Sequence, residues 1–279
     1  MRAWSGGPAD GRGVVIVVGH PRHPGLNRSG CPGDGARGFT LVELIVAIFV
    51  MTVLIGLLVP ALSDVREHAR RVVCASNQRQ MGLALNMYAD QNKDQLPPSS
   101  FLPVHNPDGE YRPQDMVMVR LDDVTRKAEH TNSTWDGIGF LYSQQYLPAS
   151  SVFYCPSHRG SIRLEAYADR WMGATGDIVV NYHYRGMGPE GHTKLSQIPS
   201  GAAMVSDSLR SVEELNHEGG FNVLQAGLAV LWTPDDNGVI EDLLLRTDGG
   251  DGDADTARTA WQTLDGISPA QQGGAFAGR

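Results

Sequence analysis

The feature that most constrains this chain is one long apolar run. It extends from Phe39 to Leu62, and Glu43 is its only ionisable residue. About 20 consecutive apolar residues are needed to cross the hydrocarbon core of a bilayer as a helix. A buried helix of a globular protein is usually shorter than this run. The sequence therefore predicts a single transmembrane helix over residues 39–62.

Charge is distributed unevenly on the two sides of this run. Residues 1–38 contain five Arg and two Asp, a net charge of +3, so the total of -8 leaves -11 for residues 39–279. Positively charged flanks of membrane spans stay in the cytoplasm. We therefore expect a single-pass protein of the inner (cytoplasmic) membrane, with a cytoplasmic N-terminus and an extracytoplasmic, periplasmic C-terminal domain. The acidic remainder argues against nucleic acid as a partner.

The residues around the start of the run carry a recognisable motif. No Ala-x-Ala site closes the run, as it would in a secretory signal peptide, and the polar break at Ala36-Arg37-Gly38 precedes it. The stretch Gly38-Phe39-Thr40-Leu41-Val42-Glu43 resembles the type III prepilin signal G-F-T-L-x-E of type IV pilins and type II secretion pseudopilins. The resemblance implies cleavage between Gly38 and Phe39 by a prepilin peptidase, which also N-methylates Phe39.

Residues 1–38 are then a leader peptide. This length is long for a prepilin leader, so either the leader is extended or the start lies too far upstream. In both cases we exclude residues 1–38, including Cys31, from the mature protein.

Two residues of the apolar run have an expected role in assembly. A charged side chain inside the membrane is costly and needs a partner or a function. The resemblance implies that Glu43 neutralises the Phe39 amine of a neighbouring subunit, whereas a Glu near a helix end could instead reach the membrane surface. Pro60 removes one helical hydrogen bond. In the resembled family such a proline accompanies a bend or melted stretch, and the alternative is a proline at the membrane boundary.

An amphipathic stalk helix is predicted over residues 63–95, before Pro97-Pro98. Its arginines are expected on solvated faces. Apolar side chains recur there at intervals compatible with one helical face. They are Val65, Ala69, Val72, Val73, Met81, Leu85 and Tyr88.

The remainder predicts a soluble α+β head over residues 96–246, with loops in region 99–135 and a small antiparallel sheet on which the long helix packs, as in pilins. A short hairpin is expected at Ala226-Gly227. The candidate strands are Val152–Cys155, Ile178–Tyr184, Ala202–Ser206, Phe221–Gln225 and Leu228–Trp232.

A second motif lies near the end of the head. Residues 216–230 resemble a pseudopilin-like subgroup whose C-terminal domain carries a His-x9-Asp-Gly pattern, and Cys155-Pro156-Ser157 resembles a Cys-Pro-Ser stretch common there. The matching residues are His217, Gly219, Gly220 and Asn222. Gly227-Leu228 stands where the subgroup has Asp-Gly, so that turn is altered. His217 lacks a nucleophile and an orienting acid at recognisable spacing, so we expect a structural role and no enzymatic activity.

Two of the three cysteines follow the membrane run. Cys74 and Cys155 would lie outside the cytoplasm, where a disulfide can persist. The alternative is two free, partly buried thiols.

The C-terminal segment 247–279 is rich in Gly, Asp, Ala and Gln, and predicts a flexible tail. Within it Asp251, Asp253 and Asp255 follow a D-x-D-x-D pattern that could hold calcium, whose ligands are oxygens. The bidentate Glu of an EF-hand is absent, because position 262 is Gln262. A solvated acidic tail is the simpler interpretation, and no other cofactor is expected.

The function that these features predict is a pilin-like or pseudopilin subunit that polymerises into a type II secretion or type IV pilus-like filament. Its expected partners are the prepilin peptidase, other pseudopilins, the membrane, and an inner-membrane platform with an assembly ATPase, since this chain has no P-loop. The alternative is a membrane-anchored extracytoplasmic binding module that forms no long filament. A tethered enzyme is a third class, for which no site is visible.

Overall fold

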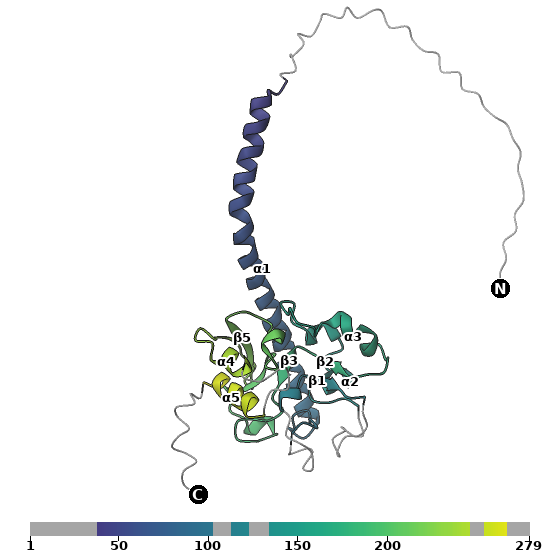
Figure 1. Cartoon of the computed structure of the whole chain (residues 1–279). Coiled ribbons are helices and arrows are strands. Elements are labelled where there is room, and N and C mark those ends of the chain that lie inside the picture. Colours follow the sequence, from purple (N-terminus) through teal and green to yellow (C-terminus); the bar gives the residue numbers. More distant parts are fainter. Residues whose placement is uncertain (1–37, 103–112, 123–133, 246–253, 267–279) are drawn as a thin grey trace, which may run out of the picture. The chain divides into compact units, whose positions relative to one another are not determined.

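The computed structural model describes residues 38–102, 113–122, 134–245 and 254–266 (Figure 1). The chain divides into two units, Met1–Leu54 and Ile55–Arg279, which are described separately. Helix α1 (Leu41–Gln91) begins in the first unit and ends in the second.

The start of α1 is held by a reciprocal cap. The Thr40 backbone N–H and hydroxyl donate to Glu43 Oε2 at 2.8 and 2.9 Å, and the Glu43 backbone N–H donates to Thr40 Oγ1 at 3.2 Å. This pattern is a capping box, which satisfies backbone donors that a helix start leaves unpaired. Glu43 therefore has a local partner in addition to any partner in another subunit.

The segment Leu41–Val59 of α1 is long and apolar enough to cross a membrane. Its mean hydropathy is 2.9 and none of it is buried, and it is the only such helix among the described residues. This finding agrees with a single membrane anchor. The helical backbone continues through Pro60, so the melted stretch implied by the resemblance is not present in α1.

The stalk half of α1, residues 63–91, ends four residues earlier than predicted and packs into the head through one face. That face consists of Cys74, Gln78, Met81, Leu85 and Tyr88, all buried. Three valines assigned to this face by periodicity are exposed instead. They are Val65, Val72 and Val73. The prediction was wrong for them because the polar pair Cys74 and Gln78 belongs to the buried face.

The head contains two antiparallel sheets. The larger has the strand order β3-β4-β5-β6, and the smaller pairs β1 with β2. The strands are β1 (Met118–Arg120), β2 (Ile178–Val179), β3 (Tyr182–Tyr184), β4 (Ala203–Asp207), β5 (Gly220–Gln225) and β6 (Val230–Pro234). The short helices of the head are α2 (Gly139–Ser143), α3 (Leu164–Trp171), α4 (Val239–Leu245) and α5 (Ala254–Leu264).

Helices cover both faces of the four-stranded sheet. Alternate residues of a strand point to opposite faces. Leu224 of β5 packs in the same core as Met81 and Leu85 of α1, whereas Phe221 and Val223 pack with α4 and α5. A Cβ added to Gly82 of α1 would lie 2.9 Å from Leu224 Cδ1, so glycine permits the close approach of helix and strand. The sheet is thus sandwiched between the stalk half of α1 and the C-terminal helices, which confirms the predicted α+β class.

Three predicted strands and the hairpin are found with small shifts, as β4, β5 and β6. The run Ile178–Tyr184 divides between the two sheets, as β2 and β3. The fifth prediction was wrong, because Ser150–Phe153 is a 3₁₀ helix. A short apolar run does not by itself distinguish a strand from a buried helical turn.

Part of the expected flexible tail is ordered structure. Residues Ala254–Leu264 form α5, whose Ala257, Ala260, Trp261 and Leu264 are buried. The Arg185 guanidinium also binds the Asp265 carboxylate at 2.8 Å. The prediction of a flexible tail was wrong for these residues. It was made from composition, which does not register that apolar side chains recur at helical spacing within an Ala-rich and Asp-rich segment.

The buried carboxyl of Asp136 predicts a pH dependence of stability. It accepts hydrogen bonds from the Ser99 hydroxyl at 2.7 Å and the Ser100 N–H at 2.7 Å, yet burial raises its pKa from 3.8 to about 6. A raised pKa stabilises the folded state below pH 3.8, and this contribution is lost as pH rises through 6. Protonation between pH 7 and pH 4 should therefore add roughly 2 kcal/mol to the free energy of unfolding.

Urea unfolding of the detergent-solubilised protein at several pH values tests this. Asp136→Asn should flatten the pH dependence by about that amount. An unchanged slope in the variant would show that another group is responsible.

Candidate functional site

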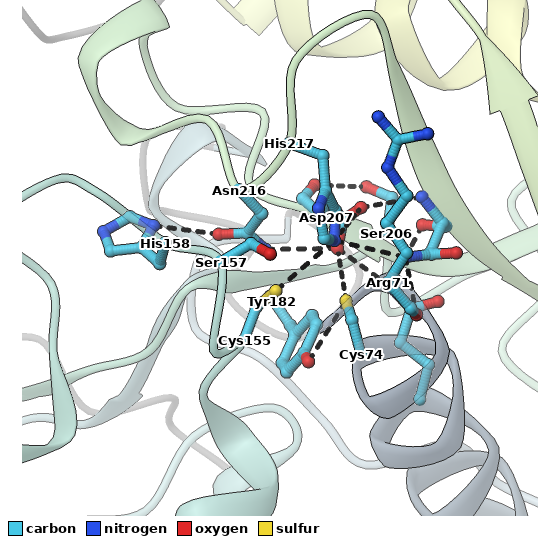
Figure 2. Close-up of polar contacts among 12 residues, drawn as sticks. Arg71, Cys74, Cys155, Ser157, His158, Tyr182, Ser206, Asp207, Asn216 and His217 are labelled. Atoms are coloured by element: carbon cyan, nitrogen blue, oxygen red, sulfur yellow. Dashed lines mark hydrogen bonds and ion pairs between the residues drawn. The ribbon is translucent and has the colours of Figure 1, made fainter. Parts of the chain in front are cut away.

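A buried polar cluster lies where α1 meets the sheet (Figure 2). Four side chains from separate segments form it. They are Cys74 of α1, Cys155 after the 3₁₀ helix, Asp207 at the end of β4, and His217 in the turn before β5. One atom from each, a sulfur, an oxygen or a ring nitrogen, lies within 4.8 Å of all the others. None of the four side chains is exposed, the largest exposed fraction being 5% at His217.

Asp207 is the centre of the hydrogen bonds in this cluster. Its Oδ1 accepts from Cys74 Sγ at 3.0 Å, from Asn216 Nδ2 at 3.1 Å and from Gln78 Nε2 at 3.3 Å. Its Oδ2 accepts from the Asn222 backbone N–H at 2.7 Å. A fully buried carboxylate is tolerated when it is paired or hydrogen-bonded in this way.

His217 connects the cluster to α1. Its Nδ1–H donates to Glu67 Oε1 at 2.7 Å, and its Nε2 lies 3.4 Å from Cys155 Sγ and 3.8 Å from Asp207 Oδ2. Glu67 also accepts from the Ser157 hydroxyl at 3.0 Å. The hydrogen bond to Glu67 fixes the orientation of the ring, so Nε2 points to the cysteines and the aspartate.

Arg71 lies at the edge of the cluster, beside Trp232 and Glu67. Its guanidinium lies 4.1 Å from the centre of the Trp232 ring and 3.8 Å from Glu67 Oε1. The Trp232 ring in turn makes an edge contact with His217, at 5.7 Å between ring centres. The expectation that all arginines of the stalk lie on solvated faces is therefore wrong for Arg71, which stacks on β6.

The two thiols have different acidities. Burial alone would raise the pKa of Cys155, but hydrogen bonds from Cys74 and His217 outweigh it and lower the pKa to about 7. Burial, together with the neighbouring Cys155 and Asp207, holds the pKa of Cys74 well above its usual range. Burial would lower the pKa of His217, but the contact with Cys155 and the charge of Asp207 raise it to about 9.

This arrangement permits three kinds of chemistry. Cys155, His217 and Glu67 lie in the order of a nucleophile, a base and an orienting acid. The two nearby sulfurs could be oxidised to a disulfide. The four donor atoms together could bind a metal ion.

The structure brings Cys74 and Cys155 together but keeps both as free, buried thiols. Of the two alternatives expected for this pair, the disulfide is not present in the structure. Their second alternative, free buried thiols, describes this structure.

The motif residues around His217 also converge here. Asn222 Nδ2 lies 3.3 Å from His217 Nε2, and its backbone N–H holds Asp207. Gly219 has φ +74°, which favours glycine, and a Cβ on Gly220 would lie 2.6 Å from the Thr233 carbonyl oxygen of β6. Both glycines therefore shape the turn that positions His217.

The altered turn Gly227-Leu228 still closes the β5–β6 hairpin. The Leu228 N–H donates to the Gln225 carbonyl at 2.9 Å, and Leu228 itself has φ +69°. A left-handed conformation costs about 1–2 kcal/mol for a residue with a Cβ. The hairpin prediction is confirmed, with leucine in a position that suits glycine better.

Several site residues were missed by sequence reasoning. The missed residues Glu67, Arg71 and Gln78 lie on the same face of α1 as Cys74, a spacing that could have indicated a polar stripe. Asp207 ends an apolar strand, which is a weak signal alone. Its contact with Cys74 joins residues 133 positions apart, and no local pattern predicts that contact.

The remaining predicted site residues lie elsewhere. Gly38 and Phe39 are exposed and precede α1, and Glu43 is in its first turn. For the calcium pattern, Asp251 and Asp253 lie outside the described residues, and Asp255 is in α5.

Two comparisons with protein families found matches. The profile of a family described as a protein of unknown function (DUF1559) matches residues 63–207, which is more than half of the chain. A profile described as the prokaryotic N-terminal methylation motif matches residues 34–59. No curated protein and no solved structure matches the chain. The first match includes Glu67, Cys74, Cys155 and Asp207 and ends before His217.

Proposed function

Because the chain belongs to the DUF1559 family and carries a prokaryotic N-terminal methylation motif, we propose that its mature form assembles into a pilin-like filament. The motif makes it a pilin-like precursor of the kind processed by a prepilin peptidase. In the proposal, the helix that starts at Phe39 forms the filament core and the head forms its surface.

The observation that carries the proposal is the unpartnered apolar helix next to the motif. The segment Leu41–Val59 has no buried residue, and its side chains need either lipid or other protein around them. Once the leader is removed, this helix starts with an amine close to Glu43. A membrane anchor alone would need the apolar run but not the glutamate.

The stalk half of α1 offers further support. Val65, Val72, Leu83 and Met87 recur at helical spacing, and each is at least half exposed. They lie away from the face that packs into the head. A stripe of apolar side chains on a helix is typical of a surface that packs against another helix.

Glu43 is the residue that distinguishes assembly from simple anchoring. Its Oε2 atom already serves the Thr40 cap. A carboxylate has two oxygens and about four acceptor positions, so it can also receive the Phe39 amine of a neighbouring subunit. Such a pair is favourable in a low dielectric only when both charges are present.

Glu43→Gln separates the two roles. Glutamine at this position preserves a capping box but removes the charge. Loss of one member of a buried charge pair costs about 3–5 kcal/mol, so association of subunits should fall by at least about a hundredfold. Co-purification of two differently tagged copies from detergent extracts measures it, normalised to processed protein.

Thr40→Ala is the matched control, because it removes the hydroxyl part of the cap and keeps the charge of Glu43. It should retain association if it is processed. If Glu43→Gln associates like wild type, Glu43 acts only as a cap and the filament proposal loses its main support.

The orientation and partners follow from the same proposal. The head lies outside the cytoplasm, and an inner-membrane platform with an assembly ATPase supplies the force. A type II secretion pseudopilus or a type IV pilus-like filament would both fit. A membrane-anchored binding module is the alternative, and it predicts that Glu43→Gln leaves the protein unchanged.

Enzymatic catalysis is not part of the proposal. Cys155 is only 4% exposed, and its sulfur lies beside Asp207 and Cys74. A nucleophile needs an accessible position within reach of the reacting atom.

A further inference from the structure

We propose that Cys74, Cys155, Asp207 and His217 form a zinc site that joins the stalk half of α1 to the head. The four donor atoms converge from four separate segments and lie within 4.8 Å of one another. All four side chains are buried. Neither family description assigns a metal to this chain, and the site is independent of filament assembly.

Two of the distances between the donor atoms match those around a tetrahedral ion. Zinc binds sulfur at about 2.3 Å, and nitrogen and oxygen at about 2.0–2.2 Å, so neighbouring donors should be separated by about 3.4–3.8 Å. The structure places His217 Nε2 3.4 Å from Cys155 Sγ and 3.8 Å from Asp207 Oδ2. The shorter contact, 3.0 Å from Cys74 Sγ to Asp207 Oδ1, is a thiol hydrogen bond that would lengthen on loss of its proton.

The charges of the cluster also favour a cation. Two thiols and a carboxylate meet at one buried point, and their anionic forms would repel each other there without a positive charge. Binding of Zn²⁺ releases to solvent the protons of the two thiols and any proton that His217 carries on Nε2, and leaves two thiolates, the carboxylate and a neutral His217. A second carboxylate, that of Glu67, lies at the edge of the site. Its negative charge is balanced by Arg71, whose guanidinium is 3.8 Å away.

Neighbouring residues already hold each donor in place. Glu67 fixes the Nδ1–H side of His217 at 2.7 Å, which is the carboxylate–histidine arrangement common in zinc sites. The Tyr182 hydroxyl donates to Cys74 Sγ at 3.3 Å, and Asn181 Oδ1 accepts from the Cys155 N–H at 2.7 Å. Asp207 keeps Oδ2 toward His217 while Gln78 and Asn216 bind Oδ1.

The donor types point to zinc among the divalent ions. Two sulfurs, one imidazole and one carboxylate form a soft, four-coordinate set, which suits Zn²⁺ better than Ca²⁺ or Mg²⁺. With four protein donors the site would be closed and structural. Because its ligands come from positions 74, 155, 207 and 217, one ion would connect α1 with three segments of the head.

Metal analysis of the full processed protein, purified in detergent under reducing conditions, tests the site. We expect about one zinc per chain after equilibration with Zn²⁺ and removal of excess. At a zinc concentration about 100 times the Kd, Tm should rise by about 5–10 °C. Replacement of zinc by Co²⁺ should produce thiolate-to-cobalt charge-transfer absorption, which reports the sulfur ligands directly.

Two ligand variants and a control make the result specific. Cys74→Ser should abolish the cobalt thiolate band or weaken it strongly, and His217→Ala should lose the bound zinc. His68→Ala, an exposed histidine on the same helix, should keep both.

Wild-type measurements do not depend on the folding of any variant. A chain that takes up no zinc, or whose intact mass shows a Cys74–Cys155 disulfide after purification without reductant from its own membrane, would overturn the proposal. Zinc bound without a cobalt thiolate band would overturn it as well.

Discussion

Asp207→Ala is expected to lower the free energy of unfolding by roughly 3–5 kcal/mol, the cost of breaking a buried charged network. The carboxylate accepts hydrogen bonds from Cys74, Gln78, Asn216 and the Asn222 backbone. Alanine would remove the acceptor of the Cys74 thiol and of the Asn222 N–H, whereas the amides of Gln78 and Asn216 would keep their bonds to the carbonyls of Asn222 and Asn181. Each buried donor left without an acceptor costs about 1–3 kcal/mol, not additively. Urea unfolding of the processed protein in detergent measures the change.

Asp90→Ala is the matched control. Asp90 is an exposed residue of the same helix that carries Cys74 and Gln78, so its loss should change stability by no more than about 0.5 kcal/mol. Asp207→Asn should fall between the two, because the amide keeps one oxygen acceptor. Equal stabilities for Asp207→Ala and Asp90→Ala would show that the cluster does not hold α1 to the head.

Gly38→Val is expected to block removal of the leader almost completely. Gly38 is exposed before α1, and a Cβ added there would meet no atom within 4 Å. The folded chain therefore has no steric need for glycine at this position, and the requirement must come from the peptidase that cuts after it. The uncleaved precursor would accumulate in the membrane, visible as a larger species in immunoblots of membrane fractions.

Gly56→Ala is the control for this prediction. Gly56 also lies in the apolar part of α1 with no atom within 4 Å of an added Cβ. Its variant should be processed like wild type. If Gly38→Val were processed at the normal rate, cleavage would not occur at the Gly38–Phe39 bond.

Local patterns predicted much of this fold. The apolar run predicted the membrane part of α1, and β-branched and apolar residues predicted β4 and β5. Patterns failed where tertiary contacts decide the outcome. The buried face of the stalk helix was predicted from its valines. In the structure Cys74 and Gln78 are on the buried face instead, because their polar atoms donate hydrogen bonds to Asp207. The tail was predicted to be flexible because it is rich in Gly and Asp, and α5 was therefore missed. Trp261 of α5 packs against the sheet.

The candidate site could be predicted only in pieces. Resemblance to a known subgroup singled out Cys155, His217 and Asn222, and cysteine counting paired Cys74 with Cys155. Helical spacing could place Glu67 on the face of α1 that carries Cys74, but it could not predict the contacts of Glu67 and Asp207 with His217. The Glu67–His217 contact joins residues 150 positions apart. In contrast, the contact of Glu43 with Thr40 is one that sequence spacing can predict, because the two residues are three positions apart.

The most direct test of the account is the intact mass of the protein extracted from its own membrane. If the signal is processed as proposed, the mass should correspond to a chain that begins at Phe39, lacks residues 1–38 and carries one added methyl group on its N-terminal amine. A chain that retains the leader, or one cut at another bond, would contradict the account.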